Sequence, residues 1–125
     1  LTGDDLVFTG HIPFEELLSV YRASDLFVSL SQHEGFCLPL IESMAMDLPV
    51  LARSVGAVPE TLGGAGLLIE KERVDQIAAM AEQIIGSNTL SAELRTRGRE
   101  RLELYRRESD PAKFLDLIRR AVGDA

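Results

Sequence analysis

The sequence lacks several features that mark particular classes of protein. Cys37 is its one cysteine, so an intrachain disulfide is excluded and an intracellular setting is favoured. The longest unbroken apolar run is about six residues, from Phe36 to Ile41, which predicts neither a signal peptide nor a transmembrane helix. The sequence therefore indicates a cytoplasmic protein, with peripheral contact at the cytoplasmic face of a membrane as an open alternative.

Positive charge is also scarce, because 13 Lys and Arg residues stand against 20 Asp and Glu residues for a net charge of -7. This balance argues against nucleic-acid binding through the whole surface. No His, Cys or Asp cluster has the spacing of metal ligands, and Gly63-Gly64-Ala65-Gly66 lacks the Lys-Ser/Thr of a phosphate loop. The remaining composition, 46% hydrophobic and 26% charged over 125 residues, is that of one globular domain spanning residues 1–125.

Apolar runs and helical periodicity predict strands that alternate with helices. Short β-type runs predict strands at residues 6–9, 26–30, 48–52 and 67–69. Helical spacing predicts a helix between Pro13 and Asp25, and others at 38–46, at a short segment ending at 62, at 74–85 and at 90–107. A last helix follows the Ser109-Asp110-Pro111 cap, with an apolar face of Phe114, Leu117, Ile118 and Ala121.

This alternation predicts an α/β fold with a parallel sheet that is covered by helices on both faces. Ligands of such sheets bind at the carboxyl ends of the strands. Three polar, glycine-bearing loops should meet there, namely residues 10–12, 31–38 and 54–60. This edge of the sheet is where a binding site is expected.

The second of these loops contains the strongest pattern, His33-Glu34-Gly35-Phe36-Cys37-Leu38-Pro39-Leu40-Ile41-Glu42. Glu34 should lie in the loop and Glu42 just over one turn into the following helix. Between them, Gly35 allows a close backbone approach, and the amides of residues 36–38 form a helix N-terminus suited to phosphate. Two acceptors of hydroxyl groups around an anion site suit a nucleotide sugar, a diphosphate with a sugar at each end.

Plainer interpretations of the same residues stay open. Glutamates are common on surfaces, and a buried Glu42 could cap backbone amides or pair with an arginine such as Arg53. Residues 35–38 could form an ordinary tight turn. The charged segment between Leu90 and Arg107 is typical of a solvated helix face, with contact to a membrane surface as the weaker alternative.

Four further side chains are ambiguous as site residues. His33 could act as a general acid or base or donate to a sugar, or it could simply face solvent. His11 could help to wall a nucleobase, and Ser31 could contact phosphate, although a surface position and a capping role are the simpler assignments. Cys37 has no histidine placed to activate a thiol nucleophile, which favours a small, half-buried residue.

A series of short segments, spread over nearly the whole chain, follows a known order. The segments are Val7-Phe8-Thr9-Gly10, Glu15-Glu16-Leu17 to Tyr21, Ala23-Ser24-Asp25-Leu26-Phe27-Val28, Ser31, Glu34-Gly35-Phe36, Leu38-Pro39 through Glu42, Pro49-Val50, Gly56, Pro59-Glu60 and Gly66-Leu67-Leu68. In this order they resemble the C-terminal, nucleotide-sugar-binding domain of the retaining glycosyltransferases called group 1, which have the GT-B fold of two Rossmann-like domains.

The resemblance implies a role for each matched residue. Glu42 would hold the ribose hydroxyls, and Glu34, the expected catalytic residue, would contact the donor sugar near its reacting carbon. The amides of Phe36, Cys37 and Leu38, after Gly35, would bind the sugar or the diphosphate. Two further segments would complete the site. Ser31 occupies the position of the serine in the family's Pro-Ser pair, and the loop Gly10-His11-Ile12 would contact the nucleobase through its backbone.

The resemblance also implies the chemistry. The donor would be a UDP-, GDP- or ADP-sugar, and a hexose would be transferred with retention to a glycan or lipid-linked acceptor. No cofactor or metal would be needed, because fixed positive groups and a helix dipole stabilise the departing diphosphate. The patterns at residues 33–37 and 59–63 resemble members that build cell-surface polysaccharides.

The chain departs from the family's pattern at several positions. Cys37, Asp47 and Ala57 stand where glycines are usual, and Leu30 replaces the proline before Ser31. Two leading strands with a basic arginine and lysine pair, and the acceptor-binding N-terminal domain, are expected before residue 7 and are absent. We therefore expect that this chain alone is inactive, and that its sheet rearranges, self-associates or borrows strands.

Two other functions stay open from the sequence. One is an inactive module that completes a split or oligomeric fold, and the other is a sugar-nucleotide epimerase with a GT-B-like fold.

Overall fold

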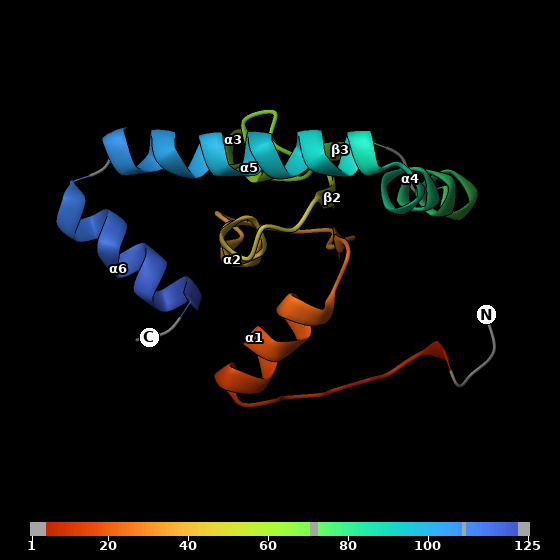
Figure 1. Ribbon diagram of the computed structural model, residues 1–125, viewed down its shortest axis with the longest axis horizontal. Helices are drawn as coiled ribbons and strands as arrows, with labels where there is room; N and C mark the ends of the chain where they lie inside the picture. Colours follow the sequence, from red (N-terminus) through yellow and green to blue (C-terminus); the bar gives the residue numbers. More distant parts are fainter. Residues whose placement is uncertain (1–4, 71–72, 109, 123–125) are drawn as a thin grey trace.

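The computed structural model describes residues 5–70, 73–108 and 110–122, in which helices and strands alternate (Figure 1). The elements in chain order are α1 (Phe14–Ala23), β1 (Phe27–Ser29), α2 (Leu38–Ala45), β2 (Val50–Arg53), α3 (Val58–Leu62), β3 (Leu67–Ile69), α4 (Val74–Gly86), α5 (Asn88–Glu108) and α6 (Pro111–Val122). Each predicted helix is present, and three of the four predicted strands are formed. The α/β fold class is confirmed.

The three strands form a parallel sheet in the order β1-β2-β3. Phe27 pairs with Val50, and Leu51 pairs with Leu67. The central strand β2 is buried on both faces, since Val50, Leu51 and Ala52 are fully buried. This burial explains why the strand is apolar without alternation.

Side chains of β2 alternate between two core clusters, one on each face of the sheet. Val50 and Ala52 join the larger cluster, which includes side chains of α2 and α3. Leu51 joins the other cluster, with Ile84 of α4. The helix α5 runs across the molecule and contributes Leu94 to the second cluster, while its Leu102 and Tyr105 pack against the first (Figure 1).

The prediction of a strand at residues 6–9 is wrong. This segment has no regular structure, and Leu6, Val7 and Phe8 are 57%, 84% and 93% exposed. Figure 1 shows it running extended along the bottom of the molecule, below the sheet and α1. A short extended run becomes a strand only when a neighbour completes its hydrogen bonds, and no described strand lies beside it.

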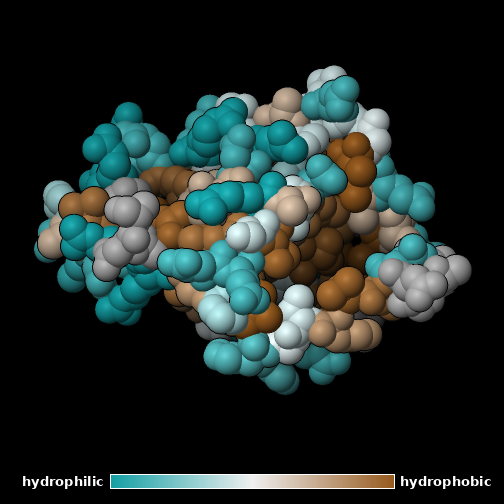
Figure 2. Space-filling model, turned by 60° about the horizontal axis from the view of Figure 1, so that its bottom comes forward, coloured by the Kyte–Doolittle hydropathy of each residue, from teal (hydrophilic) through white to brown (hydrophobic). Residues whose placement is uncertain are grey.

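The edge of the sheet at β1 is correspondingly open. β1 is an outer strand, and Val28 and the adjoining Leu30 are 40% and 47% exposed. Seen from the underside, the surface is hollowed and apolar residues gather in and around the hollow (Figure 2). Self-association of this edge stays a prediction.

Two residues other than glycine adopt the left-handed conformation, and they flank α2. Cys37 precedes the helix with φ 57°, and Asp47 follows it with φ 59°. Both stand where the family resemblance expects glycine, whose freedom at positive φ explains that preference. The Asp47 carboxylate also binds Arg99 of α5 at 2.5 Å, which ties the end of α2 to α5.

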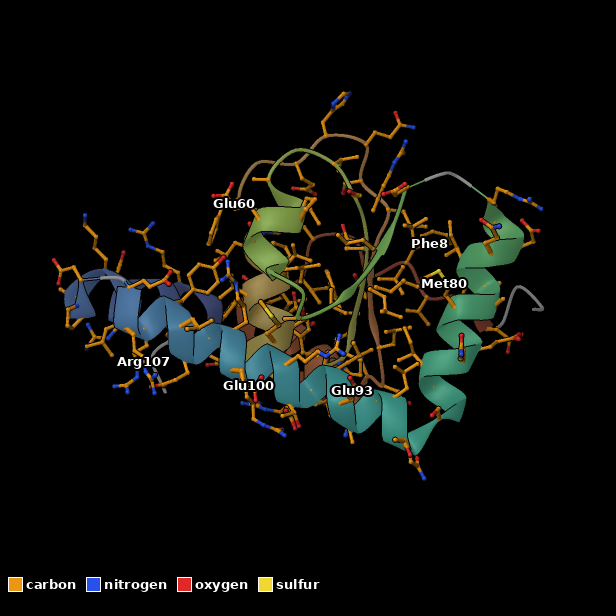
Figure 3. The ribbon with its side chains drawn as sticks, turned by 90° about the horizontal axis from the view of Figure 1, so that it is seen from above. Phe8, Glu60, Met80, Glu93, Glu100 and Arg107 are labelled. Atoms are coloured by element: carbon orange, nitrogen blue, oxygen red, sulfur yellow. The ribbon has the colours of Figure 1, made fainter. Side chains whose placement is uncertain are left out.

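The predicted solvated face of α5 is present on its outer side. Glu93, Glu100 and Arg107 follow one another along this helix and are exposed (Figure 3). Exposed ion pairs join Arg97 to Glu93, and Arg106 and Arg107 to Glu103. Such pairs contribute little to stability, which is the behaviour expected of a solvated face.

Arg101 departs from that pattern, because it faces α3 and caps the end of that helix. Its Nη2 donates to the carbonyl oxygen of Glu60 at 2.6 Å, and its Nε donates to that of Thr61 at 3.1 Å. The Tyr105 hydroxyl donates to the Thr61 carbonyl oxygen at 2.8 Å. A cation at the last carbonyls of a helix is favourable. One side of α5 therefore supports α3 instead of facing water.

The final helix, α6, begins as its cap predicts, because Asp110 Oδ1 accepts the Ala112 amide at 3.0 Å. Ser109 and the side chains of Phe114, Leu117 and Ala121, which the sequence assigns to the cap and to the apolar face, lie outside the described residues.

Candidate functional site

The loop between β1 and α2 ends in a helix N-terminus that no described side chain caps. Cys37, in its left-handed conformation, occupies the N-cap position, and Pro39 lies in the first turn. The Cys37 carbonyl oxygen accepts the Leu40 amide at 3.0 Å, while Gly35 and Phe36 before it are exposed. The positive end of the α2 dipole therefore points into this loop, as an anion site requires.

Glu42 lies in the second turn of α2 and is buried, with 7% of its surface exposed. Its Oε2 accepts a hydrogen bond from the Tyr21 hydroxyl of α1 at 2.8 Å. Burial raises the pKa of Glu42, and the bond from Tyr21 partly opposes that rise. Burial of a carboxylate is unfavourable, so a buried carboxylate with a shifted pKa is a candidate for ligand binding.

Tyr21 is the partner that the sequence interpretation missed. For a buried Glu42 the sequence offers backbone amides or an arginine such as Arg53 as partners, and it does not point to Tyr21. Tyr21 is buried in α1, with 6% exposed, and its ring lies 6.1 Å from that of Phe27. The available signal was the hydroxyl itself, because a buried tyrosine hydroxyl needs a partner.

Glu34 is half-buried, and its backbone lies close to Gly56 in the loop after β2. Gly56 has φ 51°, and a Cβ added to it would lie 1.9 Å from the Glu34 carbonyl oxygen. The Thr61 hydroxyl of α3 donates to the Phe36 carbonyl oxygen at 2.9 Å. The loops 31–38 and 54–60 therefore meet, as predicted.

The third loop lies apart from this pair, at the start of α1 (Figure 1). Residues Gly10, His11 and Ile12 line a pocket of about 510 Å³ with Thr9 and the start of α1. In Figure 1, α1 lies between this segment and α2. The strand that should anchor the loop at the sheet edge is not formed, so the predicted convergence holds for two loops of three.

The structure also places the remaining candidates. Ser31 and His33 are exposed, and Leu38 is half-buried at the start of α2. Cys37 is buried in the larger core cluster, and burial, then the nearby Glu34 carboxylate, raises the pKa of its thiol. A protonated, buried thiol is a packing residue, in line with the expectation for Cys37.

Two negative observations concern the described part of the chain. Within residues 5–70, 73–108 and 110–122, no three His, Cys, Asp or Glu side chains come together as metal ligands. Over the same ranges, every helix is too short or too polar to cross a membrane.

Comparison with known proteins identifies a family. The profile of the glycosyl transferases group 1 matches residues 1–101. The O-antigen chain mannosyltransferase B of Escherichia coli is 40% identical over 72 residues, which are 58% of this chain and 19% of that protein. A D-inositol 3-phosphate glycosyltransferase of Rhodococcus erythropolis is 34% identical over 110 residues, covering 86% of this chain and 25% of that protein. The chain thus spans a quarter or less of the length of these two relatives.

A solved structure agrees with the profile. The crystal structure of the C-terminal domain of a glycosyl transferase group 1 family protein (LpcC) from Francisella tularensis superimposes with a TM-score of 0.66 at 34% identity. The match covers 78% of this chain and 51% of that domain. With a profile match over most of its length and a structural neighbour at this identity, the chain belongs to the glycosyl transferases of group 1.

Proposed function

We propose that this chain is the donor-binding part of a glycosyltransferase that moves a hexose from a nucleoside diphosphate sugar to a glycan or lipid-linked acceptor. The observation behind the proposal is the arrangement around α2. The buried Glu42 carboxylate and the half-buried Glu34 lie on either side of a helix N-terminus without a side-chain cap. The names of several relatives, mannosyltransferases among them, favour a hexose donor.

Each group then has a chemical task. Glu42 accepts hydrogen bonds from the ribose hydroxyls, and Glu34 accepts hydrogen bonds from the hydroxyls of the donor sugar near the reacting carbon. The amides of Phe36, Cys37 and Leu38 donate to the diphosphate, and the dipole of α2 stabilises the negative charge that develops as it departs. Transfer proceeds with retention and without a metal ion in this proposal.

A second candidate function has its own observation. The exposed apolar segment Leu6–Phe8 and the open edge of the sheet at β1 are surfaces that a partner chain could cover. On this alternative the chain is an assembly module that completes a split or oligomeric fold. Binding of a nucleotide sugar by the chain separates the two functions, because the assembly module requires none.

Replacing Glu42 by alanine should weaken nucleotide-sugar binding by about 100-fold. Two hydrogen bonds to a charged acceptor are worth about 3 kcal/mol in total, which corresponds to that factor. Isothermal calorimetry with UDP-, GDP- and ADP-sugars measures the loss and finds the preferred base. Glu82→Ala is the matched control, because it removes an exposed carboxylate from α4. Equal binding by Glu42→Ala and the parent chain would show that Glu42 has another role.

The purified chain should bind its donor without catalysing transfer. The basic pair and the acceptor-binding domain that the family resemblance implies are not among its 125 residues. A radiolabelled transfer assay with glycan and lipid-linked acceptors, run on the 125-residue chain, makes the test. Turnover by the chain alone contradicts this expectation.

A further inference from the structure

The contact between Tyr21 and Glu42 joins α1 to α2. Tyr21 comes from the last turns of α1, and Glu42 from the second turn of α2. Their 2.8 Å hydrogen bond is buried, with both residues under a tenth exposed. The ring of Tyr21 lies against Phe27 of β1, so the hydroxyl is held in place by packing as well as by its acceptor.

The hydroxyl acts on the carboxylate as a neutral donor. The titratable groups that face Glu42 in the described residues are Tyr21 of α1 and Cys37 at the start of α2. Burial raises the pKa of both, so each is protonated near neutral pH. Both groups are therefore neutral neighbours of the carboxylate, and the hydrogen bond from Tyr21 is the interaction that favours the ionised form of Glu42.

Resting on the function proposed above, we propose that Tyr21 is a positioning residue of the donor site, which holds Glu42 through Oε2 and leaves its remaining acceptor positions for the ribose. An ionised carboxylate offers about four lone-pair positions, and the hydroxyl occupies one. The group that binds ligand would therefore be oriented before the ligand arrives. Pre-orientation of this kind raises affinity by lowering the ordering that binding requires.

The same contact could instead compete with the ligand, and removal of the Tyr21 hydroxyl would then change the affinity in the opposite direction. If the Tyr21 hydroxyl stood where the ribose hydroxyls bind, the ligand would have to displace it. Removing the hydroxyl would then tighten binding. The two roles are distinguished by the direction of one measured change.

Tyr21→Phe removes the hydroxyl and keeps the ring. We expect two changes: a further rise in the pKa of Glu42, read by carbon-13 NMR of its side-chain carboxyl, and binding of the preferred nucleotide sugar about tenfold weaker at pH 7. Because the ionised carboxylate is the form that binds, the acid limb of the affinity profile should move to higher pH. A residue that only supports the fold would weaken binding without moving that limb.

Tyr105→Phe is the matched control, because the sequence has two tyrosines and the Tyr105 hydroxyl also makes a hydrogen bond, a part-buried one to the Thr61 carbonyl oxygen at 2.8 Å. It should leave the Glu42 titration unchanged. If Tyr21→Phe does not fold, 3-fluorotyrosine in a Tyr105→Phe background labels position 21 alone. The fluorinated phenol is the stronger donor, so the proposal expects a lower pKa for Glu42.

The results separate the two proposals. Unchanged affinity and an unchanged Glu42 titration in Tyr21→Phe overturn the positioning role, and so does tighter binding. Failure of the parent chain to bind any nucleotide sugar overturns the proposed function instead. The carboxyl titration needs no ligand, so it still shows in that case whether Tyr21 controls the ionisation of Glu42.

Discussion

A methyl group added at Gly56 should destabilise the chain by about 3–5 kcal/mol, which is exceptional for a single methyl. The added Cβ would lie 1.9 Å from the Glu34 carbonyl oxygen and 3.1 Å from its carbonyl carbon, so backbone must move. The left-handed conformation at φ 51° costs about 1–2 kcal/mol more for alanine than for glycine. Urea unfolding of Gly56→Ala against the parent chain measures the loss.

A second glycine separates the two causes. Gly64 also has a positive φ, 84°, but a Cβ there would meet nothing within 4 Å. Gly64→Ala should therefore lose only the stability that the left-handed conformation costs alanine, about 1–2 kcal/mol. If Gly56→Ala were as stable as Gly64→Ala, the close approach between the loop after β2 and the Glu34 backbone would not exist in solution.

The Gly56 substitution should also weaken donor binding in whatever fraction of the chain stays folded. The position of the Glu34 backbone depends on that close approach, and relief of the clash requires one loop to move away from the other. Calorimetry at a temperature where Gly56→Ala is folded tests the consequence. Gly86→Ala, at the exposed end of α4 with no atom within 4 Å of the new Cβ, serves as the glycine control for binding.

Replacing Glu42 by glutamine should stabilise the chain at neutral pH while weakening its binding of the donor, because an amide oxygen is a poorer acceptor than a carboxylate. Glutamine keeps an oxygen that can accept the Tyr21 hydroxyl, and it removes a charge that is 7% exposed. Replacing a destabilising functional residue in this way typically raises the free energy of unfolding by about 0.5–2 kcal/mol. Thermal unfolding of Glu42→Gln and of Glu82→Gln, an exposed control, should show a gain for the first alone.

The pH dependence gives this prediction its sign. Since burial raises the pKa of Glu42 above its ordinary value of 4.5, the folded chain holds this proton in a range where the unfolded chain has lost it. Stability therefore falls as pH rises from about 4.5 through the raised pKa. Glu42→Gln lacks this slope, so its advantage should be absent at pH 4 and largest near pH 7. An advantage that does not depend on pH would contradict the assignment.

The helices were predictable from sequence because each is specified locally. The apolar spacing of α1, the proline in the first turn of α2 and the Asp110 cap of α6 all lie within the segment that they organise. Strands depend instead on their neighbours. The run at residues 6–9 has strand-type residues, but none of the described strands lies beside it, and so it remains extended and exposed.

The candidate site divides in the same way. The position of Glu34 in a loop and of Glu42 in a helix followed from residues close by in the chain. The partner of Glu42 did not, because Tyr21 is 21 positions away and reaches it only once α1 has docked. The support of the Phe36 carbonyl by Thr61, 25 positions away, was equally hidden. These hydrogen-bond partners depend on contacts between separate elements, and the spacing of residues within one segment does not predict such contacts.

The attachment of α1 has a thermodynamic consequence. Leu18 and Tyr21 are its buried side chains in the described structure, while β2, α2 and α3 are anchored by a larger cluster of the core. Elements held by few buried contacts can open locally while the remainder of a protein stays folded. Each such opening breaks the bond between Tyr21 and Glu42. The free energy of local opening of α1, measurable by hydrogen exchange of its amides, therefore sets an upper limit on how much of the time Glu42 has its partner.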